Sequence, residues 1–204
     1  AFVPHPLPPQ LELSSEIVVA VSKAAHALGE LSGLGRNLPN PHSLIRPFIY
    51  REAVASSRIE GTQATVIDLY AYQAEQLVLP GVGSEVDRQA DVQEVVNYVR
   101  ALEAGLDQLK TYPLNLWFVR NLHQILLQGV RGEEGNPGEF RREQNFIGPA
   151  RSTILDARYV PPPAYELLPA LDSFEAYLGA TDGYPEVSRL ALIHYQFEAI
   201  HPFL

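Results

Sequence analysis

The sequence predicts an all-α fold, a bundle of helices interrupted by one irregular excursion that carries a small β-hairpin. Several long segments repeat apolar side chains every three to four residues, which is the period of an amphipathic helix. Gly and Pro gather between these segments and above all in residues 130–162. Hydrophobic residues make up 46% of the 204 residues, so the chain can bury a sizeable core.

The N-terminal part predicts an extended arm followed by two helices. Prolines crowd residues 4–9 and exclude a helix there. A helix begins near Ser14 or Ser15, either of which suits an N-cap, and ends in the glycines at 33 and 35. A second helix spans about 41–61. It starts at an Asn-Pro pair, which suits the N-cap and first turn, and closes at a Glu-Gly pair.

The remaining helices follow from similar signals. Thr65 and Asp68 form a capping-box pattern that opens a third helix through about Gln76, and a Pro-Gly loop follows at 79–83. The clearest amphipathic period in the chain predicts a helix over residues 87–109. Further helices are expected at about 115–128, 164–178 and 185–200.

Residues 130–162 break the helical pattern, and such a long irregular stretch in a helical domain is more often functional than idle. The β-preferring side chains of residues 146–147 and 158–160 predict the two strands of a hairpin. Arg141 and Arg142 precede the hairpin as a basic pair. They could meet nucleotide phosphates or be solvated, and solvation is the favoured alternative.

Composition excludes several classes of function. The net charge of −9 argues against broad binding to nucleic-acid phosphates by this portion of the chain. The absence of Cys excludes disulfides, thiolate nucleophiles and Cys-based zinc sites, and a cytoplasmic location is expected. No run of about 20 uninterrupted apolar residues and no secretory signal is visible, so no membrane partner is expected. Because the chain starts at Ala1 and lacks Met, we expect it to be a portion of a longer protein.

The residues that could carry chemistry gather on the last predicted helix. His194, Glu198 and His201 share one helix face, but the outer histidines lie about 10 Å apart, too far for one ion to bind all three. No metal site is assigned, and His194 and Glu198 are expected to hydrogen-bond within a helical core. Pro202 disfavours helical geometry at His201, which places this imidazole at a helix end, a suitable position for a base. Taken alone, such a His-Pro pair is more often only a helix terminator.

Three sets of residues together make the sequence similar to a known family. Residues 196–204 (QFEAIHPFL) resemble the start of the Fic family signature, H-P-F-x-[D/E]-G-N-G-R-x-x-R. Residues 56–61 (SSRIEG) match the family's inhibitory motif, [S/T]-x-x-x-E-[G/N]. Residues 137–141 and 160–163 resemble the segments that flank the family's flap. These pieces follow the family's order, and the chain stops after the fourth residue of the signature.

The resemblance implies a Fic-type helical bundle with a β-hairpin flap and a protein adenylyltransferase activity. Such an enzyme transfers AMP from ATP, with Mg²⁺, to a Ser, Thr or Tyr hydroxyl of a target protein. His201 would be the catalytic base that takes the hydroxyl proton. The phosphate loop, the acidic Mg²⁺ ligand and both arginines of the signature would follow Leu204, so this portion alone is expected to be inactive. Residues 1–110 would form an N-terminal helical region with the inhibitory helix at about 41–61, and residues 111–204 an incomplete Fic core.

The resemblance also implies roles for the inhibitory motif. Glu60 would pair with the signature's second arginine and occupy the space of the γ-phosphate, so that Glu60 and His201 both border the ATP site. Ser56, one turn earlier, would help to fix the Glu60 carboxylate, and Gly61 would complete the motif. Tyr159 and Val160 would form the flap edge on which a target protein docks by strand addition.

Two alternatives to AMP transfer remain open. The chain could transfer a different phosphate-containing group, or it could be a non-catalytic helical interaction and regulatory module. A homodimer that controls access to Glu60 is compatible with the sequence, and nucleic-acid binding is expected only if a further C-terminal domain exists. The aromatic stripe of Trp117, Phe118 and His123 is expected to be core and is given no function.

Overall fold

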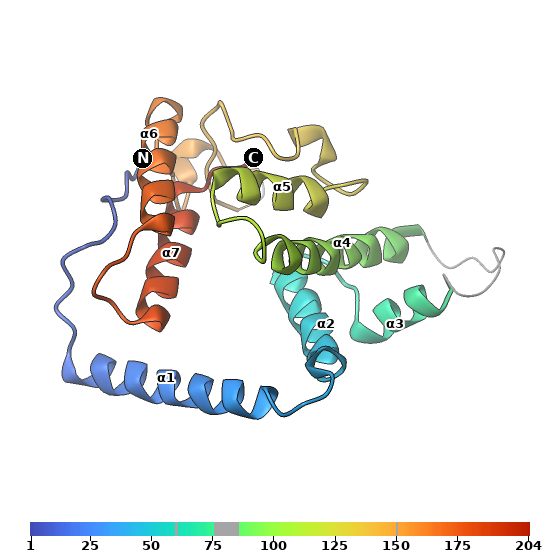
Figure 1. The fold of residues 1–204 in the computed structure, drawn as a ribbon. Helices are drawn as coiled ribbons and strands as arrows, with labels where there is room; N and C mark the ends of the chain where they lie inside the picture. Colours follow the sequence, from blue (N-terminus) through green and yellow to red (C-terminus); the bar gives the residue numbers. More distant parts are fainter. Residues whose placement is uncertain (60, 76–85, 150) are drawn as a thin grey trace. The chain divides into compact units, whose positions relative to one another are not determined.

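The computed structural model describes residues 1–59, 61–75, 86–149 and 151–204, and within them the fold is helical (Figure 1). Over these residues it contains seven α-helices and no β-strand, which confirms the predicted all-α class. The helices are α1 (Ser15–Gly35), α2 (Pro41–Ile59), α3 (Val66–Glu75), α4 (Val86–Gln108), α5 (Leu116–Leu126), α6 (Ala164–Gly179) and α7 (Glu186–Ile200). The predicted loop at 79–83 lies outside the described residues.

Local side-chain chemistry sets several helix boundaries. The Ser14 hydroxyl accepts a hydrogen bond from the Ile17 N–H at 3.4 Å, which caps the start of α1. At the start of α3, the Thr65 N–H donates to the Asp68 carboxylate at 2.8 Å while the Asp68 N–H donates to the Thr65 hydroxyl at 3.3 Å. This reciprocal pair confirms the predicted capping box. Gly61 follows α2 with a φ of +102°, a left-handed conformation that Gly adopts at little cost.

The chain divides into two compact units that are not continuous in sequence. The first unit comprises Ala1–Asn37, Leu114–Leu116 and Glu139–Leu204, and the second comprises Leu38–Pro113 and Trp117–Gly138. In the first unit α1 and α6 both pack on α7, and in the second α2 and α3 both pack on α4. The first unit holds His201 and the second holds the motif at 56–61. The expected division of the sequence at residue 110 stays a prediction.

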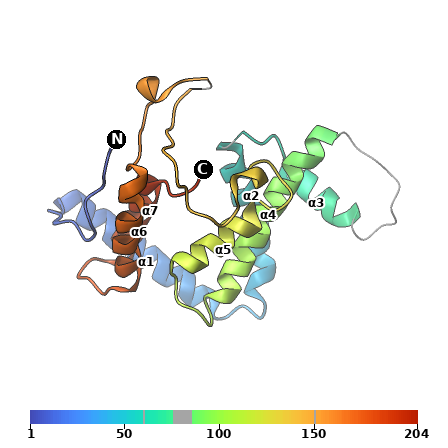
Figure 2. The same ribbon diagram turned by 90° about the horizontal axis from the view of Figure 1, so that it is seen from above.

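The second unit is built around α4, which lies beside α2 in both ribbon views (Figures 1 and 2). Val92, Val95 and Val99 lie on the face that the predicted period indicates and are buried against α2 and α3. The prediction is wrong for the end of that face, where Leu106 is 53% exposed. The core comprises Tyr50, Ala53, Val54, Ala64, Leu69, Val92, Val95 and Val99. Asn97 is buried beside this core, and its side-chain amide donates to the carbonyls of Leu126 at 3.1 Å and Gln128 at 2.7 Å. These bonds satisfy carbonyls at the end of α5.

The first unit is built around α6 and α7, which run side by side in both ribbon views (Figures 1 and 2). Its buried core comprises Leu167, Leu171, Phe174 and Ile200. The carboxylate of Glu175 on α6 accepts a hydrogen bond from the Leu116 N–H at 2.7 Å, which ties in the short segment at 114–116. Because Ile200 is fully buried, the core holds the last turn of α7, immediately before His201.

Replacing Leu171 by Ala should lower the free energy of unfolding by about 2–5 kcal/mol, because the change opens a cavity in the core of the first unit. The side chain is 1% exposed in the structure, whereas Leu168, on the same helix, is 63% exposed. Urea denaturation followed by circular dichroism measures the effect. Leu168→Ala is the matched control, with an expected change within about 0.5 kcal/mol. Equal midpoints for the two variants would contradict the assignment of this core.

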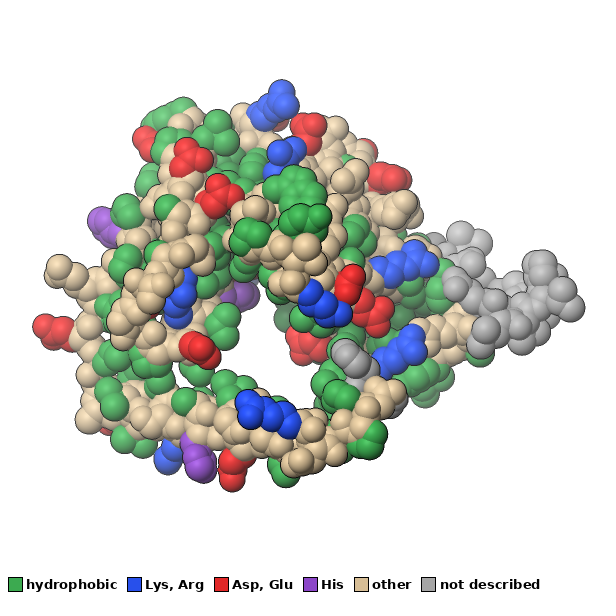
Figure 3. Space-filling model, in the orientation of Figure 1, with side chains coloured by type: hydrophobic (Ala, Val, Ile, Leu, Met, Phe, Trp, Pro, Cys, Tyr) green, Lys and Arg blue, Asp and Glu red, His purple; other side chains and the backbone are tan. Residues whose placement is uncertain are grey.

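The apolar period of the first predicted helix correctly indicates α1, but no residue of this helix is buried. Hydrophobic side chains are visible on the surface that α1 forms along the lower edge of Figure 3. By length and composition alone α1 could cross a membrane, a property that core helices of soluble proteins and N-terminal signal sequences share. The absence of a membrane partner therefore stays a prediction.

Candidate active site around His201

His201 occupies the C-cap of α7, where the helix gives way to a loop. Its φ of +46° and ψ of +66° are left-handed, and its N–H donates to the Phe197 carbonyl at 3.0 Å. A residue with a Cβ atom pays about 1–2 kcal/mol for this conformation. Such a conformation persists only where surrounding contacts enforce it. The contacts that do so at His201 come from residues 141–159.

Arg141 makes most of these contacts. It is 3% exposed, and its Nε donates to the His201 carbonyl at 2.9 Å. Its Nη2 donates to the carbonyls of Pro162 at 2.7 Å and Ile200 at 3.4 Å, and its Nη1 donates to the Glu143 carbonyl at 3.0 Å. Burial lowers the pKa of the Arg141 guanidinium from its ordinary value. The side chain therefore places a buried cation at the negative end of α7, where the helix dipole favours it.

The predicted solvation of the basic pair is wrong for Arg141 and right for Arg142. The Arg142 side chain is 85% exposed and forms an ion pair with Glu139 at 3.3 Å. The sequence could not separate the two, because adjacent arginines carry the same local signal. The difference arises from tertiary contacts between Arg141 and the end of α7, about 60 residues further along the chain.

Two further side chains complete the contacts with the end of α7. The Tyr159 hydroxyl donates to the Ala199 carbonyl at 2.6 Å, and the Asn145 side-chain amide donates to the Phe203 carbonyl at 2.8 Å. The Arg141 N–H donates to the Pro202 carbonyl at 2.9 Å. Together with the Arg141 guanidinium, these donors reach every carbonyl from residue 199 to residue 203. The backbone that carries His201 is therefore held from one side along five residues.

The predicted hairpin is reduced to a single antiparallel bridge between Ile147 and Tyr159. The Ile147 N–H donates to the Tyr159 carbonyl at 2.8 Å, and the Tyr159 N–H donates back at 3.1 Å. The prolines at 161–163 have no N–H to continue a ladder, which accounts for the short pairing. The pairing with Ile147 therefore ends at Tyr159, one of the two residues that the resemblance implies as the edge for target docking.

The N-terminal arm runs along the other edge of this segment. The Phe2 N–H donates to the Val160 carbonyl at 2.8 Å, and the Phe2 and Tyr159 rings lie 6.2 Å apart. Further along the arm, the His5 carbonyl accepts from the Gln196 side chain at 3.1 Å. These contacts hold the arm on the first unit, although its prolines and lack of periodicity predict only an extended segment.

His194 and Glu198 are exposed on α7, so the expectation that they hydrogen-bond within a helical core is wrong. The buried residues of α7 are Gln196, Ala199 and Ile200, which belong to a different face of the helix. No group of three or more His, Cys, Asp or Glu side chains that could hold a metal ion occurs among the described residues.

The inhibitory motif lies in the second unit, at the end of α2. Glu60 is outside the described residues, so its predicted role is untested. The Ser56 hydroxyl donates to the Glu52 carboxylate at 3.0 Å, one turn earlier in the helix, and accepts from the Tyr98 hydroxyl at 3.5 Å. The predicted contact between Ser56 and Glu60 stays a prediction, and it would require the Ser56 hydroxyl to turn away from Glu52.

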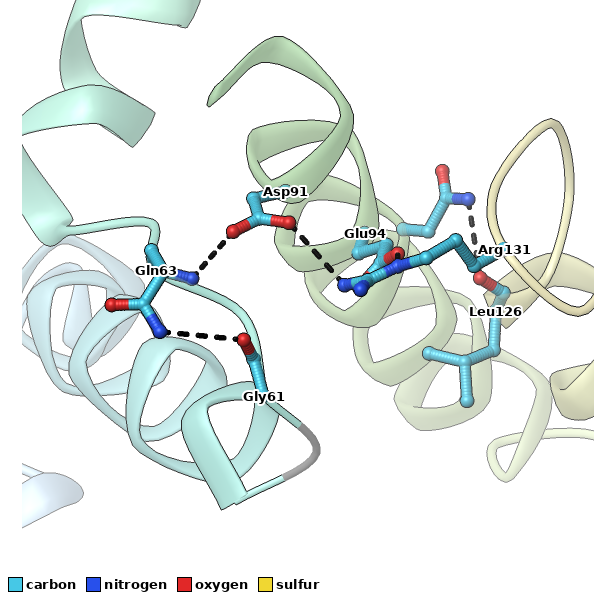
Figure 4. Close-up of polar contacts among 7 residues, drawn as sticks. Gly61, Gln63, Asp91, Glu94, Leu126 and Arg131 are labelled. Atoms are coloured by element: carbon cyan, nitrogen blue, oxygen red, sulfur yellow. Dashed lines mark hydrogen bonds and ion pairs between the residues drawn. The ribbon is translucent and has the colours of Figure 1, made fainter. Parts of the chain in front are cut away.

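The segment that follows the motif is tied to α4 by a polar network (Figure 4). The Gln63 N–H donates to one carboxylate oxygen of Asp91 at 2.5 Å, and the other oxygen lies 3.3 Å from an Arg131 Nη2. The Arg131 Nε also donates to Glu94 at 2.6 Å. The hydrogen bond that Arg131 donates to Glu94 is the main reason that the pKa of Arg131 is raised. Sequence reasoning missed this network, because its members are separated by 28 to 40 residues.

The aromatic stripe on α5 divides between core and surface. Phe118 is buried, as predicted, whereas Trp117 is exposed, so the prediction is wrong for Trp117. The His123 Nδ1 accepts a hydrogen bond from the Gly138 N–H at 2.9 Å, and burial lowers the pKa of this imidazole. Gly138 has a φ of +83°, and a Cβ atom there would lie 3.0 Å from the Arg120 carbonyl oxygen. These contacts fix the turn at Gly138 and indicate a structural role for His123.

The helical fold and the arrangement around His201 define a domain of the Fic type. A family model of the Fic/DOC N-terminal region matches residues 18–107, and the model of the Fic/DOC family matches residues 113–204. The chain belongs to the Fic/DOC family, whose members commonly transfer AMP to proteins.

Solved structures agree with this assignment of the fold. A Fic family protein from Desulfovibrio desulfuricans G20 matches with a TM-score of 0.70 and 22% identity over 96% of this chain. Fic-1 from C. elegans matches with a TM-score of 0.65 and 17% identity over 93%. A Fic domain-containing signaling protein from Bacteroides thetaiotaomicron VPI-5482 matches with a TM-score of 0.60 and 22% identity over 90%. This chain spans 55%, 54% and 65% of these three chains, respectively.

Proposed function

We propose that this chain is the base-bearing portion of a protein adenylyltransferase that transfers AMP from ATP to a Ser, Thr or Tyr hydroxyl of a target protein. The observation that carries the proposal is the placement of His201. Its backbone is held rigidly, whereas none of the described residues hydrogen-bonds to its imidazole. A base that receives a substrate proton needs a backbone that is held in place and a side chain that is not already engaged by the protein.

The proposed reaction requires a base because a neutral hydroxyl is a poor nucleophile. A ring nitrogen of His201 takes the hydroxyl proton while the hydroxyl oxygen forms a bond to the α-phosphorus of ATP. The bond between the α-phosphorus and the oxygen that bridges to the β-phosphate breaks, and pyrophosphate leaves. An imidazole suits this step because its ordinary titration range lies near neutral pH.

The described residues fit the role of the base and not that of a metal site. They contain no cluster of carboxylates or histidines that could hold Mg²⁺. The family signature places its phosphate loop and acidic ligand after the residues that correspond to His201–Leu204. The step proposed for this chain is therefore limited to the proton transfer at His201.

Label transfer with the full-length protein that contains this chain tests the proposal. ATP labelled at the α-phosphate should label a protein acceptor, whereas ATP labelled at the γ-phosphate should not. Label from the γ-phosphate would identify phosphoryl transfer instead, and label from another nucleotide alone would identify a different donor. The absence of label from any donor, even with Glu60→Gly, would overturn the enzymatic proposal and favour an interaction module.

The target protein is proposed to dock by strand addition at Tyr159 and Val160. The Tyr159 backbone already pairs with Ile147, so the remaining edge belongs to Val160, whose carbonyl accepts from the Phe2 N–H. The Val160 N–H donates no hydrogen bond to any of the described residues. This N–H is the donor that an incoming strand would use.

Val160→Pro should lower kcat/KM for a protein acceptor about fivefold, because it removes one hydrogen bond of about 1 kcal/mol from the docked target. The dissociation constant for ATP should stay unchanged. Val160→Thr is the matched control, since it keeps both the N–H and the β-preferring side chain. Equal losses of acceptor labelling for the Pro and Thr variants would contradict docking through the backbone.

A further inference from the structure

The His201 backbone needs an external restraint, because its left-handed conformation is unfavourable for a residue with a Cβ atom. The helical hydrogen bond from its N–H to Phe197 fixes only one side of the residue. The His201 carbonyl is held separately, because it accepts a hydrogen bond from the Arg141 Nε at 2.9 Å. Rotation of the peptide that follows His201 would break this bond. Arg141 therefore opposes the return of His201 to an ordinary conformation.

The same guanidinium is itself held in place. Its Nη2 donates to the carbonyl of Pro162 at 2.7 Å, and its Nη1 donates to that of Glu143 at 3.0 Å. These partners belong to the irregular segment, whereas Ile200 and His201 belong to the end of α7. The planar guanidinium thus connects the irregular segment to the end of α7. The single ammonium group of a lysine cannot make the same set of hydrogen bonds.

We propose that Arg141 is a positioning residue for the proposed base: it holds the His201 backbone in its left-handed C-cap conformation and thereby aims the imidazole. This inference rests on the proposed role of His201. Among the described residues, the Arg141 guanidinium hydrogen-bonds only to backbone carbonyls and is too buried to meet a substrate, so it acts through the backbone alone. Displacing a catalytic group by about 1 Å can lower a rate about 100-fold.

The other donors are weaker candidates for this role. The Tyr159 hydroxyl and the Asn145 amide contact the carbonyls of Ala199 and Phe203, which flank His201 without belonging to it. Each also contributes one hydrogen bond to the end of α7, whereas the Arg141 side chain contributes two there and places a charge against the helix dipole.

Arg141→Lys and Arg141→Met in the full-length protein test the proposal. With Glu60→Gly as the common background, kcat for AMP transfer should fall about 10- to 100-fold in the Lys variant and further in the Met variant. The KM for ATP should stay within about twofold, because only the placement of the base changes. Arg142→Lys and Arg142→Met are the matched controls at an exposed neighbour and should retain the background kcat.

Selective ¹³C-histidine labelling gives a readout that does not depend on activity. The ¹³Cα and ¹³Cβ shifts of His201, identified by their absence in His201→Ala, should move in Arg141→Lys and stay in Arg142→Lys. If the Glu60→Gly protein transfers no AMP, the proposed function fails, and these shifts still decide the positioning role. A folded Arg141→Lys variant with unchanged His201 shifts and an unchanged kcat would overturn the inference, even if its melting temperature were lower. If Arg141→Met does not fold, the kcat and the His201 shifts of Arg141→Lys alone test the inference.

Discussion

Replacing His201 by Ala should lower AMP transfer by the full-length protein about 10²- to 10⁴-fold, the usual contribution of a positioned base. The variant keeps the backbone contacts of residue 201, because its N–H and carbonyl are unchanged, and loses only the group that takes the hydroxyl proton. Initial rates with ATP labelled at the α-phosphate measure the effect. Glu60→Gly serves as the background, so that the predicted inhibition does not hide the loss.

His194→Ala is the matched control for this experiment. His194 lies two turns earlier on α7 and is exposed, so its removal should leave both the fold and the rate of transfer unchanged. A His201→Ala variant that keeps more than half of the background rate would show that the imidazole is not the base. A loss in both variants would point to α7 as a whole instead of to His201.

Glu60→Gly should raise AMP transfer by the full-length protein about 10- to 100-fold. The expectation follows from the resemblance of residues 56–61 to the family's inhibitory motif, which implies that the Glu60 carboxylate would pair with an arginine that the γ-phosphate would otherwise meet. Productive ATP binding would have to break this pair, and a hydrogen bond to a charged group contributes about 1.5–3 kcal/mol. The initial rate and the KM for ATP, measured for both proteins, test it.

Glu52→Gln provides the control for Glu60→Gly. Glu52 lies on the same helix and accepts the Ser56 hydroxyl hydrogen, a bond that an amide oxygen can also accept. We expect the Glu52→Gln rate to equal that of the wild type. Equal rates with and without the Glu60 carboxylate would end the inhibition hypothesis and leave the transferase proposal standing, since that proposal depends on His201.

Much of the fold could be predicted because its signals are local. Thr65 and Asp68 lie within one helical turn of each other, so their spacing already defines the capping box that the structure contains. The left-handed Gly61 closes α2 where the Glu-Gly pair predicts. The amphipathic period of residues 87–109 likewise corresponds to α4, because a repeat of three to four residues is itself the signal of a helix.

The contacts of the site could not be predicted, because they depend on residues far apart in sequence. Nothing in an Arg-Arg pair distinguishes the buried Arg141 from the solvated Arg142. The i, i+4 spacing of His194 and Glu198 places them on one helix face, but it does not say whether that face is covered. The packing of α1, α6, the N-terminal arm and residues 141–163 determines which side of α7 is buried.

The position of the N-terminal arm has a consequence for how a target would reach the flap. A target strand that adds at Val160 approaches the edge where the Phe2 N–H already bonds to the Val160 carbonyl. Because the arm belongs to the same chain, it competes at an effective concentration that reaches about millimolar for short flexible connections. A target that docks as proposed would therefore have to exchange with this tethered segment, and its apparent affinity would depend on how firmly Phe2 and His5 are held.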